Sequence, residues 1–195
     1  MLTSDISTIR PELFTQRHRA QLEPYLEQVG LPEDFFTDPD FECSVRQMVE
    51  LLEVAAKESG DINIGLRLGS QSLSTDFGVF GQAMRSMETI GELSKWGQEF
   101  SSVHQQSLTV TTEVNAENLI LSYQISDPSL IERRQDTEFS VGFIFCMLRE
   151  IAEQEPVLKR VDFEHSAPAD LSLHQAVFGC PMHFNQETNR LIFSA

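Results

Sequence analysis

The chain ends in Val161–His165 (VDFEH), Ala167–Asp170 (APAD), Phe178–Phe184 (FGCPMHF) and Asn189–Phe193 (NRLIF), and these four segments decide the fold. The first predicts a strand near residues 157–163. The next two predict a short helix that Asp170 caps and Gly179 ends. The remaining residues predict a final pair of strands around 182–184 and 191–193.

Two further strands precede this region. Leu108, Val110, Thr112 and Val114 alternate with polar residues, and the run from Leu119 to Ile125 does the same after the turn at residues 115–118. Such alternation predicts an antiparallel hairpin. The stretch from 129 to 153 then predicts a helix with almost no polar face, and the mixed charges at 132–136 indicate a solvated surface, with a dimer contact as the less favoured alternative.

The first half of the chain is predicted to be mostly helical. Ser44 and Gln47 form a capping box that opens a helix ending at Gly60. Thr75 or Asp76 can cap a second helix, and Thr89 with Glu92 opens a third. Helices and strands that follow one another without β-α-β alternation favour an α+β fold, in which helices pack on a small antiparallel β-sheet.

Composition limits the class of protein. The 195 residues, 41% of them apolar, are enough for one domain with a sizeable core. The net charge of −16 repels phosphate backbones, so this part should not bind DNA unaided. Three distant cysteines suggest reduced thiols, and the absence of a signal-like or membrane-length apolar run suggests a cytoplasmic protein.

Several motifs then occur in a distinctive order. They are Leu51–Ala56 (LLEVAA), Ile64–Gly69 (IGLRLG), Phe77–Met87 (FGVFGQAMRSM), Thr89–Leu93 (TIGEL) and the APAD and FGCP segments near the end. This ordered set covers nearly the whole chain. It closely resembles the N-terminal effector-binding domain of AraC-type bacterial transcription regulators, of the non-cupin, arabinose-binding-like kind. The glycines of the second motif suit a chain that turns at once.

The resemblance implies a sensing and dimerisation domain spanning residues 1–195. The implied partners are a small-molecule effector and a second copy of the chain. The resemblance implies no membrane partner. DNA would be bound only through a C-terminal helix-turn-helix domain, which this chain does not contain. The identity of the effector stays open among amino acids, fatty acids, aromatic catabolites and cyclic dinucleotides.

Candidate ligand-binding residues are polar or aromatic side chains on otherwise apolar elements, because a sensor pocket needs a few directed polar groups in an apolar wall. Four residues fit this description: Arg85, Trp96, His104 and Tyr123. Each has the alternative role of an ordinary core or surface side chain. The candidate dimer interface is the apolar face of the long helix, with Phe139, Phe143, Met147 and Ile151.

Other chemistries have less support in the sequence. Cys180 and His183 are two soft metal ligands where a closed zinc site needs four, so a structural turn is favoured there, and no metal or cofactor is expected. His165 is expected to fasten a loop by hydrogen bonds. No nucleophile–base arrangement suggests an enzyme. The alternative to a sensor is a constitutive oligomerisation or protein-interaction module without a ligand.

Overall fold

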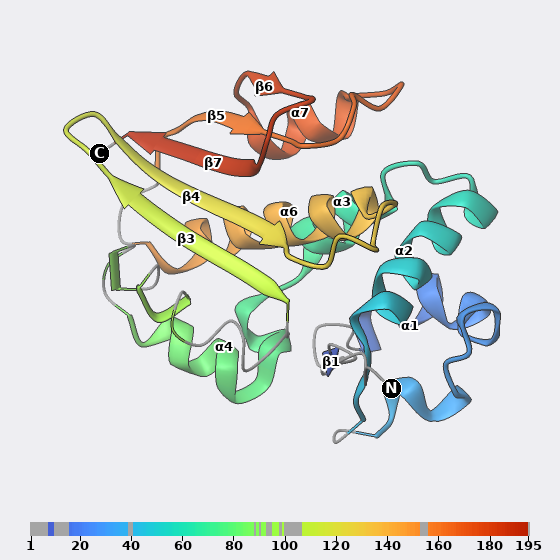
Figure 1. The fold of residues 1–195 in the computed structure, drawn as a ribbon. Helices are drawn as coiled ribbons and strands as arrows, with labels where there is room; N and C mark the ends of the chain where they lie inside the picture. The colour runs from blue at the N-terminus through green and yellow to red at the C-terminus, as the bar shows by residue number, and fades with distance from the viewer. Residues whose placement is uncertain are drawn as a thin grey trace, which may run out of the picture.

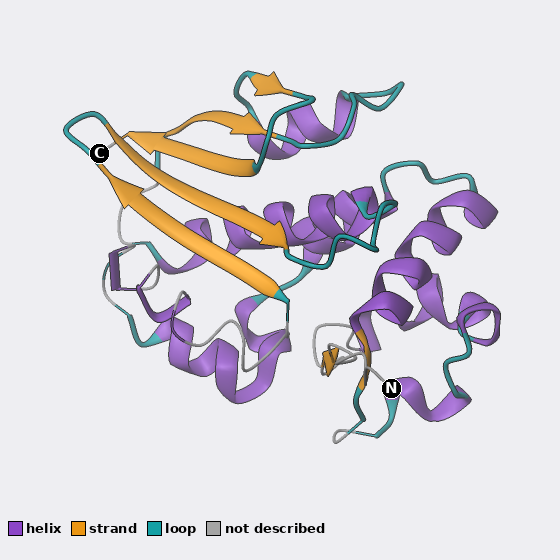
Figure 2. Cartoon of the chain, viewed as in Figure 1, coloured by secondary structure: helices purple, strands orange, loops and turns teal. Residues whose placement is uncertain are grey.

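The computed structural model describes residues 8–9, 16–38, 41–87, 89, 91–92, 95–97, 99, 107–152 and 156–194. Its helices and strands follow the order predicted for an α+β domain (Figures 1 and 2). The strands are β1 (Thr8–Ile9), β2 (Cys43–Ser44), β3 (Leu108–Val114), β4 (Asn118–Ile125), β5 (Leu158–Asp162), β6 (Met182–His183) and β7 (Asn189–Ser194). The α-helices are α1 (Gln16–Leu22), α2 (Val45–Ser59), α3 (Ile64–Gln71), α4 (Gly78–Arg85), α6 (Arg134–Ile151) and α7 (Ser172–Phe178). Short 3-10 turns cover Glu23–Tyr25, Glu27–Val29, Glu33–Phe36 and Ser74–Phe77.

The main sheet has five strands in the order β3-β4-β7-β5-β6. The predicted hairpin is confirmed, with Leu108 opposite Ile125 and Val114 opposite Leu119. The predicted pairing of the last two strands is wrong. Strand β6 pairs in parallel with β5, whereas β7 lies between β4 and β5 and is antiparallel to both. The sheet is therefore mixed, although all its other pairs are antiparallel.

Helix α2 begins and ends where local sequence signals place it. The Ser44 hydroxyl accepts from the Gln47 backbone N–H at 3.1 Å, and the Gln47 side chain accepts from the Ser44 N–H at 3.2 Å. Gly60 ends the helix with a left-handed φ of 76°, a conformation that glycine adopts without strain. The capping box of Thr89 and Glu92 is also formed, but most of the helix predicted after it lies outside the described residues.

Helix α3 contains the glycine motif that the sequence suggested was a turn. Gly65 and Gly69 instead lie inside the helix, and a Cβ on either would overlap a backbone carbonyl of α6, at Gln135 and Phe139 respectively. The absence of side chains there lets the two helices cross at very short distance. Figures 1 and 2 show α3 and α6 together beneath the sheet.

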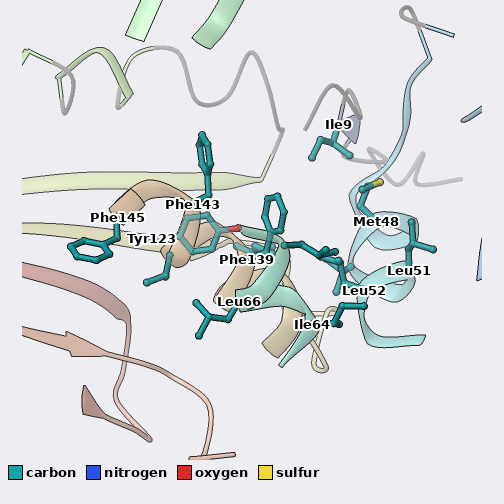
Figure 3. Close-up of a cluster of buried hydrophobic side chains, with 14 of the residues drawn as sticks. Ile9, Met48, Leu51, Leu52, Ile64, Leu66, Tyr123, Phe139, Phe143 and Phe145 are labelled. Atoms are coloured by element: carbon teal, nitrogen blue, oxygen red, sulfur yellow. The ribbon is translucent and has the colours of Figure 1, made fainter. Parts of the chain in front are cut away.

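The hydrophobic core lies between α6 and the inner face of the sheet and continues towards α2 and α3. Figure 3 shows Tyr123 from the sheet and Phe139, Phe143 and Phe145 from α6 beside Leu66 of α3. Helix α6 is therefore the central element of the domain, because it contacts the sheet on one side and α2 and α3 on the other.

Candidate functional site: a polar pocket at the start of helix α6

The first turns of α6 carry polar side chains that are buried. Gln135 and Glu138 are 0% exposed and Asp136 is 6% exposed. The expectation that residues 132–136 form a solvated face is therefore wrong for Gln135 and Asp136. Arg133 provides no side-chain cap for this helix. Instead, Glu53 of α2 accepts a hydrogen bond from the Gln135 backbone N–H at 2.7 Å.

Gln135 connects α6 to the beginning of α3. Its side-chain amide donates to the Ile62 carbonyl at 2.8 Å and accepts from the Gly65 N–H at 2.9 Å. The Arg134 guanidinium donates to the same Ile62 carbonyl. A buried amide whose donor and acceptor are both used fixes the relative position of the two backbones.

Asp136 faces the sheet. Tyr123 of β4 donates its hydroxyl hydrogen to Asp136 Oδ2 at 2.8 Å, and the Ser140 hydroxyl donates to the Tyr123 oxygen at 2.9 Å. Burial raises the pKa of Asp136 to about 6, partly offset by the Tyr123 hydrogen bond. The pKa of Tyr123 is raised well above its ordinary value, first by burial and then by the neighbouring Asp136 charge.

Glu138 lies in a second buried cluster, with two histidines. Its Oε1 atom is 3.1 Å from His174 Nε2, 3.3 Å from Arg134 NH1 and 3.6 Å from His165 Nε2. Among the described residues, its Oε2 atom and the two ring nitrogens of the buried His174 have no partner in hydrogen-bonding geometry, although His174 Nε2 lies close to Glu138 Oε1. His165 also fastens its own loop by hydrogen bonds, as expected. Its ring nitrogen Nδ1 contacts the Ser166 carbonyl, and its backbone carbonyl accepts from the Asn185 N–H. Burial lowers the pKa of His165.

Arg133 joins the beginning of α6 to the loop after β5. It donates to both carboxylate oxygens of Glu164, at 2.7 and 3.0 Å, and to the Ile125 and Leu130 carbonyls at 3.3 and 3.4 Å. The paired guanidinium and carboxylate are both mostly buried. A two-point contact of this kind is among the stronger polar interactions in proteins.

A pocket of about 450 Å³ opens above these groups. We call it the α6 pocket, and its lining residues are Glu53, Ile131, Glu132, Arg133, Arg134, Glu164, His165 and Ser166. They come from α2, from the β4–α6 loop, from the start of α6 and from the loop after β5. Its volume is in the range of small-molecule sites.

The four residues predicted to bind ligand do not converge. Tyr123 contacts Asp136 near the start of α6, whereas Arg85 of α4 pairs with Glu150 at 3.5 Å near its end. The two positions are about 20 Å apart along the helix, at about 1.5 Å per residue. Trp96 is half-buried against the core, and His104 lies outside the described residues.

The four residues predicted to form a dimer interface lie on the helix that fills the core of this chain. Phe139, Phe143 and Met147 are 3%, 6% and 4% exposed, and Ile151 is half-buried. Of these four residues, Ile151 therefore has the most surface left for a partner. The homodimer itself stays a prediction.

The described residues include no group of three His, Cys, Asp or Glu side chains that could hold a metal ion. Cys43, Cys146 and Cys180 are free thiols, and burial raises the pKa of each. In the described part of the chain, no helix is long and apolar enough to span a membrane.

Sequence reasoning missed Glu53, Gln135, Asp136, Glu138, and the buried His18. A signal was available for three of them, since Gln135, Asp136 and Glu138 open a helix whose later residues are almost all apolar. A charged beginning on a core helix must either face solvent or find buried partners. His18 pairs with Ser72 at 2.7 Å, and burial lowers its pKa to about 4.

Comparison with known proteins gives a consistent result. Residues 20–195 match the family model for the arabinose-binding domain of AraC transcription regulators, N-terminal part. The transcriptional regulator VirS, a helix-turn-helix protein of Mycobacterium tuberculosis, is 23% identical over 166 residues, which cover 84% of this chain and 48% of VirS, in both strains compared. The chain thus spans about half the length of these curated relatives.

Solved structures agree on the fold. The transcriptional regulator CdpR from Pseudomonas aeruginosa aligns with a TM-score of 0.56 and 17% identity, over 89% of this chain and 53% of CdpR. An oxygen-binding H-NOX domain related to soluble guanylate cyclases aligns with a TM-score of 0.54 and 11% identity, over 94% of this chain and 88% of that domain. Identities this low show a shared fold and do not extend to ligands.

Proposed function

Because the chain belongs to the family of N-terminal arabinose-binding domains of AraC transcription regulators, we propose that it senses a small-molecule effector in the α6 pocket and transmits occupancy to a DNA-binding domain. The curated relatives are transcription regulators by name. Regulation of transcription is thus the setting, and the α6 pocket is our proposal for where sensing occurs.

The observation that carries this proposal is the way in which the pocket wall is anchored. Glu53 ties it to α2, Gln135 and Arg134 tie it to α3, and Arg133 ties it to the segment after β5. The hydrogen bond from Tyr123 to Asp136 connects the start of α6, next to the pocket, to the sheet. A ligand that shifts Glu53, Arg133 or Arg134 therefore perturbs a bond to α2, to the segment after β5 or to α3, respectively.

Helix α6 offers a route for the response. It extends from the pocket to the Arg85–Glu150 pair near its other end, about 27 Å for its length. A packed helix moves as a unit, so a small displacement at its start is carried to its end. The ligand changes the population of two arrangements only as far as its affinities for them differ.

Of the predicted ligand-binding residues, Tyr123 belongs to this site through its bond to Asp136. Arg85, Trp96 and His104 stay predictions for a separate contact. The homodimer and DNA binding through a C-terminal helix-turn-helix domain are proposed for the whole protein, on the basis of the family. On the same basis we propose a cytoplasmic location, where promoter DNA is accessible. In a dimer, the sensing domains would set the spacing of two DNA-binding heads.

Thermal unfolding in the presence of a broad metabolite panel tests the sensing step. A true effector raises the melting temperature, because it binds the folded state. Ser166→Trp, which fills the pocket, should abolish that shift, whereas Thr111→Trp on an exposed position of β3 should preserve it. A shift that survives Ser166→Trp would place the effector elsewhere, and the absence of any shift would contradict sensing.

A further inference from the structure

The hydrogen-bonding groups of the α6 pocket are unevenly used. Both of its arginines are already engaged: Arg133 by Glu164 and backbone carbonyls, and Arg134 by Glu138 and the Ile62 carbonyl. A ligand with an anionic group would have to displace one of these intramolecular partners. An anionic ligand could therefore use the positive charge of the pocket only at the free-energy cost of breaking one of these intramolecular bonds.

The carboxylates, in contrast, retain acceptor capacity. Glu132 is exposed and forms no ion pair with any residue in the described part of the chain. One oxygen of Glu53 accepts from the Gln135 N–H. In the pocket lining, the three carboxylates of Glu53, Glu132 and Glu164 outnumber the two guanidiniums of Arg133 and Arg134. The site thus carries an excess of negative charge at neutral pH.

The buried Glu138 is an independent sign of this excess. It is 0% exposed and lies against Arg134, His165 and His174, yet its Oε2 atom has no hydrogen-bond donor among the described residues. An ionised carboxylate oxygen that is buried without a donor is costly. Burial raises the pKa of Glu53; the Gln135 N–H and Arg134 partly offset this rise, and the charges of Glu132 and Glu138 add to it. A positive charge in the pocket would stabilise the ionised form of both carboxylates.

We propose that the effector of this domain is a small organic cation, bound through an amine or guanidinium group by Glu53 and Glu132. This inference rests on the proposed sensing function and narrows it to a ligand class. The rest of the ligand lies against Ile131 at the rim, an aliphatic side chain that is 88% exposed. Amine and guanidinium groups satisfy the same carboxylates, the guanidinium with two parallel hydrogen bonds.

A matched series of fragments tests the charge and the head group separately. Butylamine, butylguanidine, butanol and butyrate share one alkyl chain and differ only in the polar end. Titration into the ¹⁵N-labelled chain should shift the amide signals of Gly65, Gln135 and Ser166 with the amine or the guanidine, at affinities on the order of millimolar for ligands of this size. Butanol and butyrate should leave these signals unchanged.

Substitutions then locate the binding. Glu132→Gln and Glu53→Gln should each weaken binding of the amine about tenfold, the size expected for one hydrogen bond to a charged group. The glutamine at position 53 can still accept from the Gln135 N–H, so the start of α6 should be retained. Glu113→Gln, on an exposed position of β3, removes the same net charge and should leave affinity unchanged.

Any of three results would overturn the inference. One is butyrate or butanol binding as tightly as the amine. Another is Glu132→Gln and Glu53→Gln binding the amine like the unaltered chain. The third is no binding of either cation at all. In each of these cases the thermal-unfolding panel tests the sensing function separately. An anionic or neutral effector whose stabilising effect is abolished by Ser166→Trp would support sensing while excluding a cationic effector.

Discussion

The two longest helices, α2 and α6, begin in opposite ways. At the start of α2, Ser44 and Gln47 satisfy each other's backbone N–H groups within four residues of chain. At the start of α6, the Gln135 N–H is met by Glu53, 82 positions away in sequence. The first arrangement caps the helix, and the Gln47 amide also donates to the nearby Val29 and Gly30 carbonyls. The second connects α2 to the start of α6 beside the pocket. Long-range partners of this kind therefore distinguish the end of the molecule where we propose that the effector binds.

Gly65→Ala should have the largest effect, because it separates α3 from the start of α6. The new Cβ would overlap the Gln135 carbonyl, which belongs to a helix backbone and cannot rotate away. We expect a loss of more than about 3 kcal/mol in the free energy of unfolding, beyond the usual cost of overpacking. Urea denaturation measures it. Gly97→Ala is the matched control, since its Cβ meets open space, and an equal loss there would refute the close crossing.

Asp136→Asn should act in the other direction. The pKa of this buried carboxyl is raised to about 6 in the fold, against an ordinary value of 3.8. Its contribution to stability is thus full below pH 3.8 and is lost as pH rises through about 6. An asparagine avoids burying the charge and can still accept from Tyr123, so we expect a gain of about 2 kcal/mol at pH 8.

The pH dependence distinguishes this effect from ordinary repacking. The gain from Asp136→Asn should shrink between pH 7 and pH 4 in urea melts performed at each pH. Asp34→Asn, at an exposed position, should change little at any pH. A gain that is the same at pH 4 and pH 8 would mean that the buried charge is not its cause.

Tyr123→Phe tests the connection between the start of α6 and the sheet. The change removes the donor to Asp136 and the acceptor for Ser140. We expect a loss of about 1.5 kcal/mol at pH 8, the cost of a hydrogen bond to a charged group. The loss should fall in the Asp136→Asn background, because the two side chains share one bond. If the effects of the two changes were additive in this double-mutant cycle, the bond would contribute little.

The sequence predicted well those structural features that depend on residues close together in the chain. The two capping boxes, the antiparallel hairpin that turns at residues 115–118 and the glycine end of α7 at Gly179 each follow from a few consecutive positions. The parallel pairing of β6 with β5 did not follow, because strand neighbours depend on the path of the whole chain. The role of Gly65 and Gly69 was missed for the same reason, as their contact is with another helix.

The candidate site was predictable only in small part. Tyr123 was recognised as a polar group on an apolar strand, and it donates a hydrogen bond to Asp136 at the start of α6; its contact with a ligand stays a prediction. The carboxylate of Glu53 gave no such sign, since an acidic residue on a helix is usually solvated. Only the packing of α2 against α6 half-buries it. A single sequence carries little information about contacts of this kind.

Ser44→Ala should give the smallest of these effects and completes the comparison. It removes the local cap of α2, for which we expect a loss of about 1 kcal/mol. Because Ser44 lies more than two helical turns before Glu53 and the remaining turns of α2 stay packed, the amide signals of Gly65 and Gln135 should not move. Ser44→Asp keeps a capping oxygen and should restore most of the stability. If Ser44→Ala instead shifted those pocket signals, the two helix starts would be coupled, and the division between a locally fixed scaffold and a long-range site would be wrong.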